Sequence, residues 1–516
     1  MRNHETRAAW DYHNATKHSL HSVQTSRHML DWANQPIPYK RYRDLTAIPL
    51  PRDLPGSRIP ALNALAGERP AAGAPRDLDL ALLASILHHT AGITKRLRIP
   101  GGFMDFRAAA CTGALYHIDF YVVCGPLAGL EAGVYHFSVQ DFALRRLRSG
   151  DFRGVLAEAT AAEPAVTPAP AILVATSTYW RNAWKYEERT YRHCYWDLGT
   201  CLANLLAVSA AHDLPARVLL GFVDGAVNRL VDVDGEREAA LAVVPLGLGA
   251  EDIAPFAPEP PVLALPVLPD SDHEIDYPAI RVMHAASSLQ NAEEVTAWRA
   301  AAEEEPDRAT TPAIAGLPLP HGIREGQPTD PIETVIRKRG SSRGFRTDPI
   351  SNAQLGTMLH AASRGIPADF ARGRGSELTQ AYVIANAVDG LPSGSYAYDP
   401  DQHALRTLAE GAFRERAGYL ALTQQLAADA AVNVYFLADL MPALERLGNR
   451  GYRAAQLEAS ITAGKLYLAA YCLGLGASGL TFFDDDVTGF FAPHAAGKSV
   501  MFLITIGQPL RRQAQA

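Results

Sequence analysis

Two stretches of this chain repeat each other at a constant offset of 261 residues, as from Gly133 to Gly394, and this duplication constrains the fold more than any single motif. The same offset relates three separate pairs of segments: 133–153 with 394–414, 171–175 with 432–436, and 189–192 with 450–453. Two copies of one unit in a single chain can pack face to face as a built-in dimer. A cleft between two such units is a favoured place for a ligand.

Length and charge define the broad class. The chain has 516 residues, which is too long for one hydrophobic core and predicts two domains with additional segments. With 48% apolar and 20% charged residues, its composition is typical of globular proteins. A net charge of −7 offers no basic field for nucleic acid, and no apolar run reaches the length of a membrane helix. We therefore expect neither nucleic acid nor a membrane as a partner.

The cysteines show no metal-binding pattern. They are five in number and scattered, with no C-x-x-C pair: Cys111, Cys124, Cys194, Cys201 and Cys472. An odd, scattered set indicates free thiols in a reducing compartment. The start of the chain also lacks a signal-peptide core, so we expect a cytoplasmic protein. His88 and His89 have no carboxylate or cysteine partner at ligand spacing, and no metal is predicted.

Hydrophobic periodicity and composition divide the chain into four parts: an N-terminal arm over 1–75 that lies on the first repeat, a first repeat over 76–251, a proline-rich linker over 252–330 and a second repeat over 331–516. In the first repeat we predict helices near 78–91 and 187–211, and strands at 117–124, 171–175, 217–221 and 241–246. In the second we predict helices at 331–339, 351–362 and 451–472, and strands at 379–385, 431–438 and 500–506. The linker is expected to hold one helix near 289–302. Helices that alternate with strands in each copy predict an α+β sandwich.

Arg339, Ser341 and Arg343 form the pattern that points most directly to a ligand. Two arginines four residues apart, with hydroxyl groups between them, can place guanidinium forks and a hydroxyl on one phosphate or on the edge of one polar ring. The alternative is a solvated basic helix end, where positive charge is favourable beside the helix dipole. Spacing alone does not decide between the two.

The order of motifs in the second repeat resembles the FMN-dependent nitroreductase family. An R-x-S-x-R-x-F motif precedes an Ile-Ser helix start, and the segments 479–487, 491–499 and 506–509 are similar to that family's flavin-contacting loop and closing strand. In the first repeat, segments 91–94, 107–116 and 133–137 resemble the SagB/ThcOx-like branch, which includes azoline dehydrogenases that act on heterocyclised peptides. The resemblance implies two three-layer α-β-α repeats that form an intramolecular pseudo-dimer, an FMN cofactor and an oxidoreductase activity.

In that family each flavin lies at a dimer interface, with the arginine–serine motif from one subunit and a Pro-Ser-x-Gly loop from the other. Here the first repeat lacks the motif, the second lacks a recognisable loop at 372–376, and Ala110 and Cys111 replace the proline and serine of the first loop. These losses are complementary, so we predict one intact composite site and one decayed site. The resemblance assigns cofactor binding to Arg339, Ser341 and Arg343, to Arg107, Cys111, Thr112 and Gly113, to Gly479 and Thr481, and to Arg511, whose alternative is a solvated tail.

Lys185 and Tyr186 match the Lys-Tyr pair of azoline dehydrogenases, whereas the second repeat has Arg446 and Leu447 at the aligned positions. Oxidation on a flavin sends a hydride to N5 and a proton to a base. A lysine desolvated in a cleft can act as that base, and a tyrosine can donate or relay the proton. The alternative is a surface lysine beside a packing tyrosine.

The favoured function is a two-electron oxidation of a peptide-derived or small heterocyclic substrate, with NAD(P)H or oxygen as redox partner. The second interpretation is an NAD(P)H-dependent nitro- or quinone reductase, and the third is a flavin-free, peptide-binding pseudoenzyme. We expect a monomer that acts as a pseudo-dimer, or a homodimer. The acidic run 484–486 is predicted to cap a helix in a solvated turn and not to bind a cation.

Overall fold

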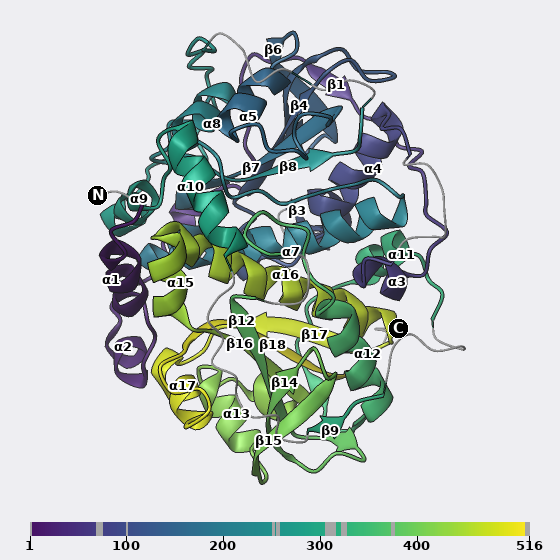
Figure 1. The fold of residues 1–516 in the computed structure, drawn as a ribbon, viewed down its shortest axis with the longest axis vertical. Coiled ribbons are helices and arrows are strands. Elements are labelled where there is room, and N and C mark those ends of the chain that lie inside the picture. The colour runs from purple at the N-terminus through teal and green to yellow at the C-terminus, as the bar shows by residue number, and fades with distance from the viewer. Residues whose placement is uncertain are drawn as a thin grey trace.

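Two halves lie on either side of a central pair of long helices, α7 (Thr190–Ala211) and α16 (Arg450–Cys472) (Figure 1). The structure is a computed structural model and describes residues 3–68, 76–99, 102–249, 253, 259–304, 316–320, 328–372 and 377–510. In these ranges no helix combines the length and the apolar character needed to span a bilayer.

Each half is built on one large antiparallel sheet, and the order of the main strands is the same in both. In the first half the order is β1 (Ala47–Pro49), β6 (Ala143–Ser149), β5 (Gly133–Ser138), β4 (Ile118–Cys124), β7 (Ala171–Thr178) and β8 (Glu238–Leu246). In the second half the order is β9 (Leu317–Pro318), β15 (Ala404–Glu410), β14 (Gly394–Asp399), β12 (Thr379–Ala385), β16 (Val432–Ala438), β18 (Ser499–Pro509) and β10 (Phe345–Arg346), with β17 (Gly476–Leu480) also on β18. The repeat in the sequence is therefore a repeat of topology, as two nitroreductase-like α+β halves require.

The other helices and short strands surround these sheets. They are α2 (Leu20–Thr25), η1 (Trp32–Asn34), α3 (Ala61–Leu65), α4 (Leu80–Ala91), η2 (Thr112–Ala114), α5 (Arg153–Ala159), α6 (Tyr179–Tyr186), η3 (Glu187–Arg189), α8 (Asp224–Leu230), α11 (Ile332–Lys338), β11 (Ile350–Ser351), α12 (Asn352–Ala362), β13 (Val388–Asp389), α13 (Arg414–Leu420), α14 (Gln425–Asp429), α15 (Leu440–Leu447) and α17 (Asp484–Phe490). Ser351 caps α12, because its Oγ accepts from the amide of Gln354 at 3.1 Å while the Gln354 side chain accepts from the Ser351 amide.

The long helices meet at equivalent residues. Gly199 and Ser460 are related by the repeat offset, and a Cβ added to Gly199 would lie 1.9 Å from Ser460 Oγ. The Ser460 hydroxyl donates to the carbonyl of Tyr195 in the facing helix at 2.8 Å. A residue that touches its own counterpart marks the pseudo-twofold axis. Each helix is buried except at one position, Ala210 in α7 and its equivalent Tyr471 in α16, so the pair forms the common core.

Reciprocal ion pairs connect the halves at the N-terminal end of this parallel helix pair, where Tyr12 packs against both Tyr191 and Tyr452. Arg192 of the first half donates to Asp484 of the second at 2.6 Å, and Arg453 of the second donates to Asp224 of the first at 2.8 Å. Arg189 and Arg450 add a second guanidinium to each carboxylate. All six side chains are buried, so each carboxylate needs its arginines to offset the loss of solvation.

Asp484 corrects one expectation. We predicted a solvated turn at 484–486, but Asp484 is only 2% exposed, because two arginines of the other half and the amide of His18 surround its carboxylate. Although burial alone would raise it, the pKa of Asp484 is held well below its usual range by Arg189 and Arg192.

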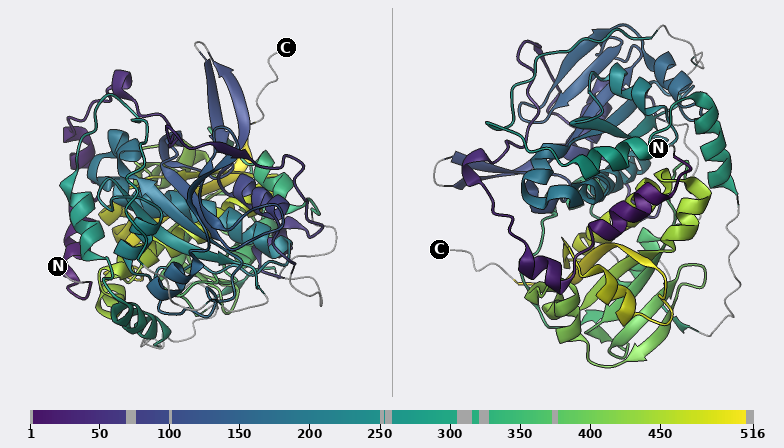
Figure 2. Two further views of the ribbon diagram at one scale, coloured as in Figure 1. Left: turned by 90° about the horizontal axis from the view of Figure 1, so that it is seen from above. Right: turned by 90° about the vertical axis from the view of Figure 1, so that its left-hand side faces the viewer.

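The N-terminal arm is more ordered than predicted. It begins with helix α1 (Arg7–Ala15), which lies across both halves and not only on the first (Figure 2). The amide of Ala9 donates to Asn449 of the second half at 2.8 Å, while Arg192 of the first half donates to Thr16 Oγ1 at 3.0 Å. The linker likewise contains two helices, α9 (Pro278–Ala286) and α10 (Ala292–Glu303), where one was predicted. The boundaries at 75, 251 and 330 stay predictions.

A two-stranded hairpin projects from the first half and was not predicted. It consists of β2 (Ile93–Ile99) and β3 (Gly102–Arg107) and stands clear of the body in both views of Figure 2. Its strand β3 leads directly into the predicted 107–113 loop.

The cross-half ion pairs generate a stability prediction. Asp484→Asn leaves two buried guanidinium groups without their carboxylate and should lower the free energy of unfolding by about 3–5 kcal/mol, measured by urea denaturation at pH 7. Because the native pKa of Asp484 is depressed, its contribution exists above the unfolded pKa of about 4 and is lost as the pH falls below it.

Asp485→Asn is the matched control. Asp485 pairs with Lys17 at 2.7 Å but is 80% exposed, so its loss should cost no more than about 1 kcal/mol. Equal destabilisation by the two substitutions would contradict a special role for the buried pair.

Candidate active site

The 107–113 loop is held by one buried carboxylate of α7. Asp197 accepts from the amide and the hydroxyl of Thr112, at 2.9 and 2.7 Å, and from the Cys111 thiol at 3.0 Å. His117 Nε2 lies 2.9 Å from the same carboxylate. The loop is therefore fixed to the central helix by side chains and main chain together.

The second half has an equivalent anchor. Glu458, at the position related to Asp197 by the repeat offset, accepts from the amides of Glu377 and Thr379 at 3.0 and 2.8 Å and from the Thr379 hydroxyl at 2.8 Å. Both carboxylates thus hold the segment that precedes the central strand of their own sheet. A structural role in both halves follows from the duplication.

Cys111, His117 and Asp197 also have the spacing of a metal site, since their ligand atoms lie within 4.8 Å of one another. Both Asp197 oxygens are already engaged by the loop, and His117 Nδ1 lies 2.8 Å from Ser177 Oγ. Because Glu458 performs the same anchoring without a histidine or thiol, we assign this cluster to holding the loop.

The structure brings the two predicted half-sites together. Arg339, which follows α11 in the second half, donates from Nε to the carbonyl of Ala108 and from its terminal nitrogen to that of Arg107, both at 3.0 Å. The arginine thereby forms a fork across the seam onto the main chain of the first half.

Ser341 lies on the second-half side of the same seam. Its hydroxyl is 3.0 Å from the hydroxyl of Tyr467, which also accepts from the amide of Gly479 at 3.1 Å. The Arg339 guanidinium lies over the Tyr467 ring, 5.8 Å from its centre. Tyr467 therefore contacts all three of these predicted residues, although the sequence analysis did not predict it. A signal for it was present in the sequence, because the equivalent residue in the first half is Leu206, which has no hydroxyl.

Lys185 and Tyr186 stand at the other side of the loop. A Cβ added to Gly113, whose φ is +61°, would lie 3.0 Å from the Tyr186 hydroxyl, so this glycine permits close approach. The Lys185 ammonium lies 5.3 Å from the centre of the Tyr186 ring. Asn182 fixes helix α6 to the loop by donating to Thr112 Oγ1 at 2.7 Å. Burial, with Asp197 adding to the effect, raises the pKa of Tyr186.

The remaining predicted residues differ in their placement. Arg343 is exposed, whereas the Arg107 guanidinium is buried and donates to the carbonyls of Pro38 and Ile118 inside the first half. The side chain of Arg107 is therefore turned away from the seam, and only its carbonyl takes part. Thr481 Oγ1 is buried without a hydrogen-bond partner among the described residues. Arg511 lies outside the described residues.

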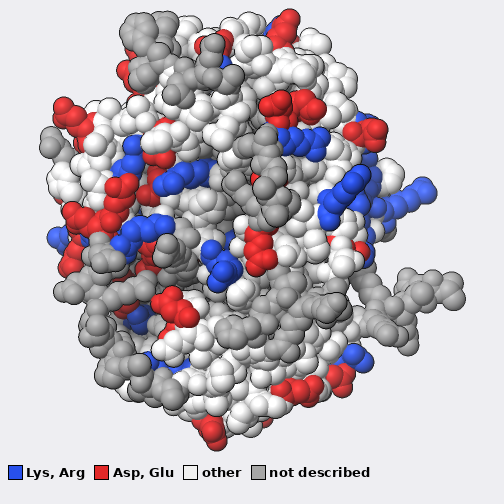
Figure 3. All heavy atoms as spheres, turned by 45° about the vertical axis from the view of Figure 1, so that its right-hand side comes forward, with Lys and Arg blue, Asp and Glu red and all other residues white. Residues whose placement is uncertain are grey.

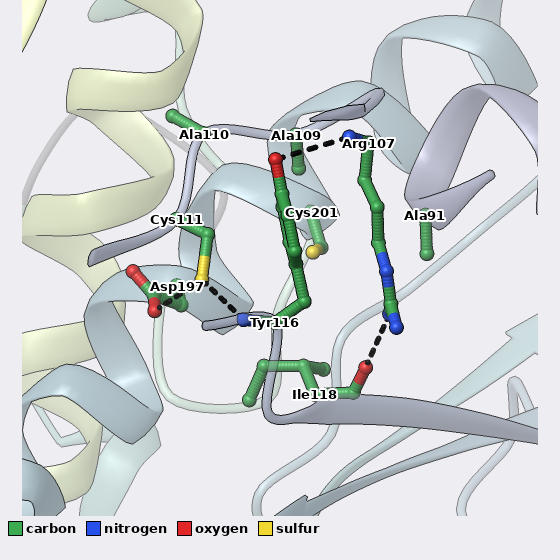
Figure 4. A pocket seen from close by; sticks show the side chains of 9 residues that line it. All are labelled: Ala91, Arg107, Ala109, Ala110, Cys111, Tyr116, Ile118, Asp197 and Cys201. Carbon is green, nitrogen blue, oxygen red and sulfur yellow. Dashed lines mark hydrogen bonds between the residues drawn. The ribbon is translucent and has the colours of Figure 1, made fainter. Parts of the chain in front are cut away.

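A small hollow lies behind the loop (Figure 4). Its volume of about 10 Å³ has room for about one water molecule. Its lining includes Arg107, Cys111, Tyr116, Asp197 and Cys201. The hollow is too small for a cofactor and belongs to the support of the loop.

Comparison with known proteins now identifies the fold. Residues 336–507 match the nitroreductase family. The chain contains a nitroreductase-family domain. The crystal structure of a nitroreductase-like protein from Anabaena variabilis, 27% identical, superposes with a TM-score of 0.77 over 98% of this chain and 99% of that one. The superposition shows that both halves share the nitroreductase fold, and the domain together with this structural neighbour indicates an oxidoreductase.

Two further relatives match parts of the chain. The nitroreductase-like protein MJ1384 of Methanocaldococcus jannaschii is 28% identical over 162 residues, which cover 30% of this chain and 81% of that protein. The trifolitoxin-processing protein TfxB of Rhizobium leguminosarum bv. trifolii is 28% identical over 174 residues, which cover 33% of this chain and 47% of TfxB.

The equivalent second seam is closed. The segment that we predicted as a strand at 217–221 makes only isolated bridges: Leu219 bridges Val243 of β8 in its own half, and Val218 bridges Ala368 of the other half. The Asp369 carboxylate accepts from the amides of Leu220 and Gly221 at 2.9 and 2.7 Å, and the amide of Val218 donates to Pro367 at 2.8 Å. The repeat offset relates Val218 to Gly479, which lies at the seam that Arg339 spans and that we call the open seam.

The twin anchors generate a matched pair of substitutions. Asp197→Asn and Glu458→Gln should each lower the free energy of unfolding by about 3 kcal/mol, because each leaves amides and hydroxyls with a weaker acceptor. Only Asp197→Asn should also raise the rate at which iodoacetamide alkylates Cys111, since only that carboxylate binds its thiol. Peptide mapping by mass spectrometry measures the alkylation. Equal alkylation in both variants would contradict the assigned roles.

Proposed function

We propose that the open seam binds FMN and that the protein oxidises a peptide-derived or small heterocyclic substrate by two electrons. The observation that carries this proposal is the fork of Arg339 on the carbonyls of residues 107 and 108, which joins the two half-sites across the seam. One wall then carries Ser341 and Gly479, and the other carries Gly113 and Tyr186.

The groups at this seam fit a flavin. The buried hydroxyl of Thr481 has no partner among the described residues, and such a group is costly unless a ligand completes its hydrogen bond. Arg343 is exposed and pairs with no carboxylate in the described part of the chain, so its guanidinium is available for a phosphate. The residues that would hold the cofactor are Arg339, Ser341, Arg343, Gly479 and Thr481 of the second half, with Cys111, Thr112 and Gly113 of the first.

The Lys-Tyr pair divides the proton chemistry. FMN supplies, when bound, a hydride acceptor at its N5. Tyr186 keeps its hydroxyl proton at neutral pH, because burial raises its pKa, so it donates a hydrogen bond to a heteroatom of the substrate. The role of base then falls to Lys185, beside the same ring, which no carboxylate among the described residues neutralises.

Two observations support the class of substrate. The first-half motifs resemble the branch that includes azoline dehydrogenases, and Lys185 and Tyr186 match the Lys-Tyr pair of those enzymes. The relative TfxB is named for the processing of trifolitoxin. Both favour an oxidation that finishes a heterocycle on a biosynthetic precursor, with oxygen or NAD(P)⁺ as the eventual electron acceptor.

Lys185→Ala tests this function. FMN-loaded protein is mixed under argon with a short peptide that carries one thiazoline ring. In the wild type the flavin absorbance should bleach and the peptide should lose two hydrogens, as mass spectrometry reports. In the variant the rate of bleaching should fall by at least about 100-fold while the flavin content stays the same, because a general base contributes about that much.

Arg229→Ala, which removes a cation of α8 that pairs with Glu259 outside every segment assigned to the seam, should behave as the wild type. Loss of flavin from Lys185→Ala would make the residue structural. Bleaching by NADPH but not by the thiazoline peptide would make the protein a reductase, and failure to take up added FMN would contradict the proposal.

A further inference from the structure

The projecting hairpin offers free strand edges. Strands β2 and β3 pair only with each other among the described residues, in a sheet separate from those of the two halves. Their outer edges therefore present main-chain amides and carbonyls without a partner strand, which is the template for adding an extended chain.

The hairpin is also basic on a chain whose net charge is −7. Lys95, Arg96 and Arg98 are exposed, and the only carboxylate of its described residues, Asp105, accepts from Arg96 at 2.6 Å and from Tyr39 at 2.7 Å. Basic side chains gather at the right-hand edge of the face shown in Figure 3. The apolar side chains of the hairpin are exposed beside these charges: Ile99, Phe103 and Met104.

A hollow of about 590 Å³ opens at the base of the hairpin. It is lined by Arg52, Asp53, Leu54, His88, Ile93, Arg96, Val139, Gln140, Phe142 and Arg337. Arg52 and Arg337 pair with no carboxylate among the described residues, and Arg52 lies over the Phe142 ring at 5.7 Å. Burial, Arg337 and Arg52 together lower the pKa of His88, so the histidine is neutral. Asp53 is the one carboxylate in the lining, and a positive excess remains.

These features together indicate a ligand. Charged side chains on a strand edge can serve only to prevent self-pairing. Prevention of self-pairing requires no hollow beside the hairpin. It also does not require that Arg52 and Arg337, the latter from the second half, line such a hollow. We propose that the hairpin and this hollow dock an extended, acidic peptide segment. The free edges pair with its main chain, and the guanidinium groups bind its carboxylates.

The docking site continues into the candidate active site. Ile93, which lines the hollow, is the register partner of Arg107, whose carbonyl accepts from Arg339 at the seam. A peptide held on the hairpin therefore passes beside the 107–113 loop. That the docked peptide is the substrate rests on the proposed function, but its binding requires no flavin chemistry.

Fluorescence anisotropy with labelled hexaglutamate, on the full chain at low ionic strength, tests the docking. Hexaglutamate should bind at least about tenfold more tightly than hexaglutamine, and added salt should weaken it because exposed charges are screened. The double variant Arg52→Ala/Arg337→Ala should weaken binding by about tenfold or more. Hexaglutamate methylated on alternate amide nitrogens keeps its charge but loses main-chain donors, and it should also bind more weakly.

The matched control is Arg229→Ala/Arg281→Ala, which removes the same charge from the region of α8 and α9, across the molecule from α4 and α11 (Figure 1). It should leave hexaglutamate binding within about twofold of the wild type, since distant exposed charges are screened. Equal binding of the two peptides, or equal loss in the two double variants, would overturn the proposal. Displacement by inorganic pyrophosphate at concentrations far below those of free hexaglutamate would make the hollow a phosphate site and overturn it also. Flavin content, read from the same samples, reports on the proposed function separately, and its loss in Arg52→Ala/Arg337→Ala would assign the arginines to the cofactor.

Discussion

The crossing of α7 and α16 is the constraint on which the rest of the structure depends. Gly199 and Ser460 occupy equivalent positions and touch each other, so no larger pair fits at this point. This close approach leaves the two sheets on opposite sides of the helix pair (Figure 1). It also brings the end of each long helix within reach of the other half, where the arginine–aspartate pairs form. The seams on both sides of the axis follow from this one contact.

The same scaffold has produced opposite outcomes at its two seams. Asp197 and Glu458 each hold a loop of their own half. Asn204 and Lys465, also equivalent, donate to the carbonyls of His89 in the last turn of α4 and of Gly365 just after α12, at 2.9 and 2.8 Å. Burial lowers the pKa of Lys465 to about 8. The seams themselves have diverged, because Arg339 spans one and Asp369 closes the other.

Asp369 explains why the second seam cannot repeat the first. Its carboxylate accepts from the amides of Leu220 and Gly221, which the repeat offset relates to Thr481 and Phe482 on the open seam. Burial raises the pKa of Asp369 to about 6, in spite of these two donors. An acidic group in this place excludes an anionic cofactor by both volume and charge.

Most secondary structure could be predicted from the sequence, because apolar period and capping residues act locally: α12 begins after Ser351, and β12 spans the predicted 379–385. The contacts between the two halves could not be predicted, because they join residues far apart in the sequence. Asp484 finds Arg192 at a separation of 292 residues, and Asp369 closes a seam through a segment without a motif. Comparison of the two repeats predicted more of the site than local patterns did, since it paired Arg339 with the 107–113 loop. The difference between Tyr467 and its equivalent Leu206 is a further signal of the same kind.

The number of FMN molecules bound per chain is the most direct test of one open and one closed seam. Purified protein is saturated with FMN, freed of excess, and analysed by flavin absorbance after denaturation and by intact mass under native conditions. We predict one FMN per chain. Two per chain would contradict the closure of the second seam by Asp369, and none would contradict the flavin site itself.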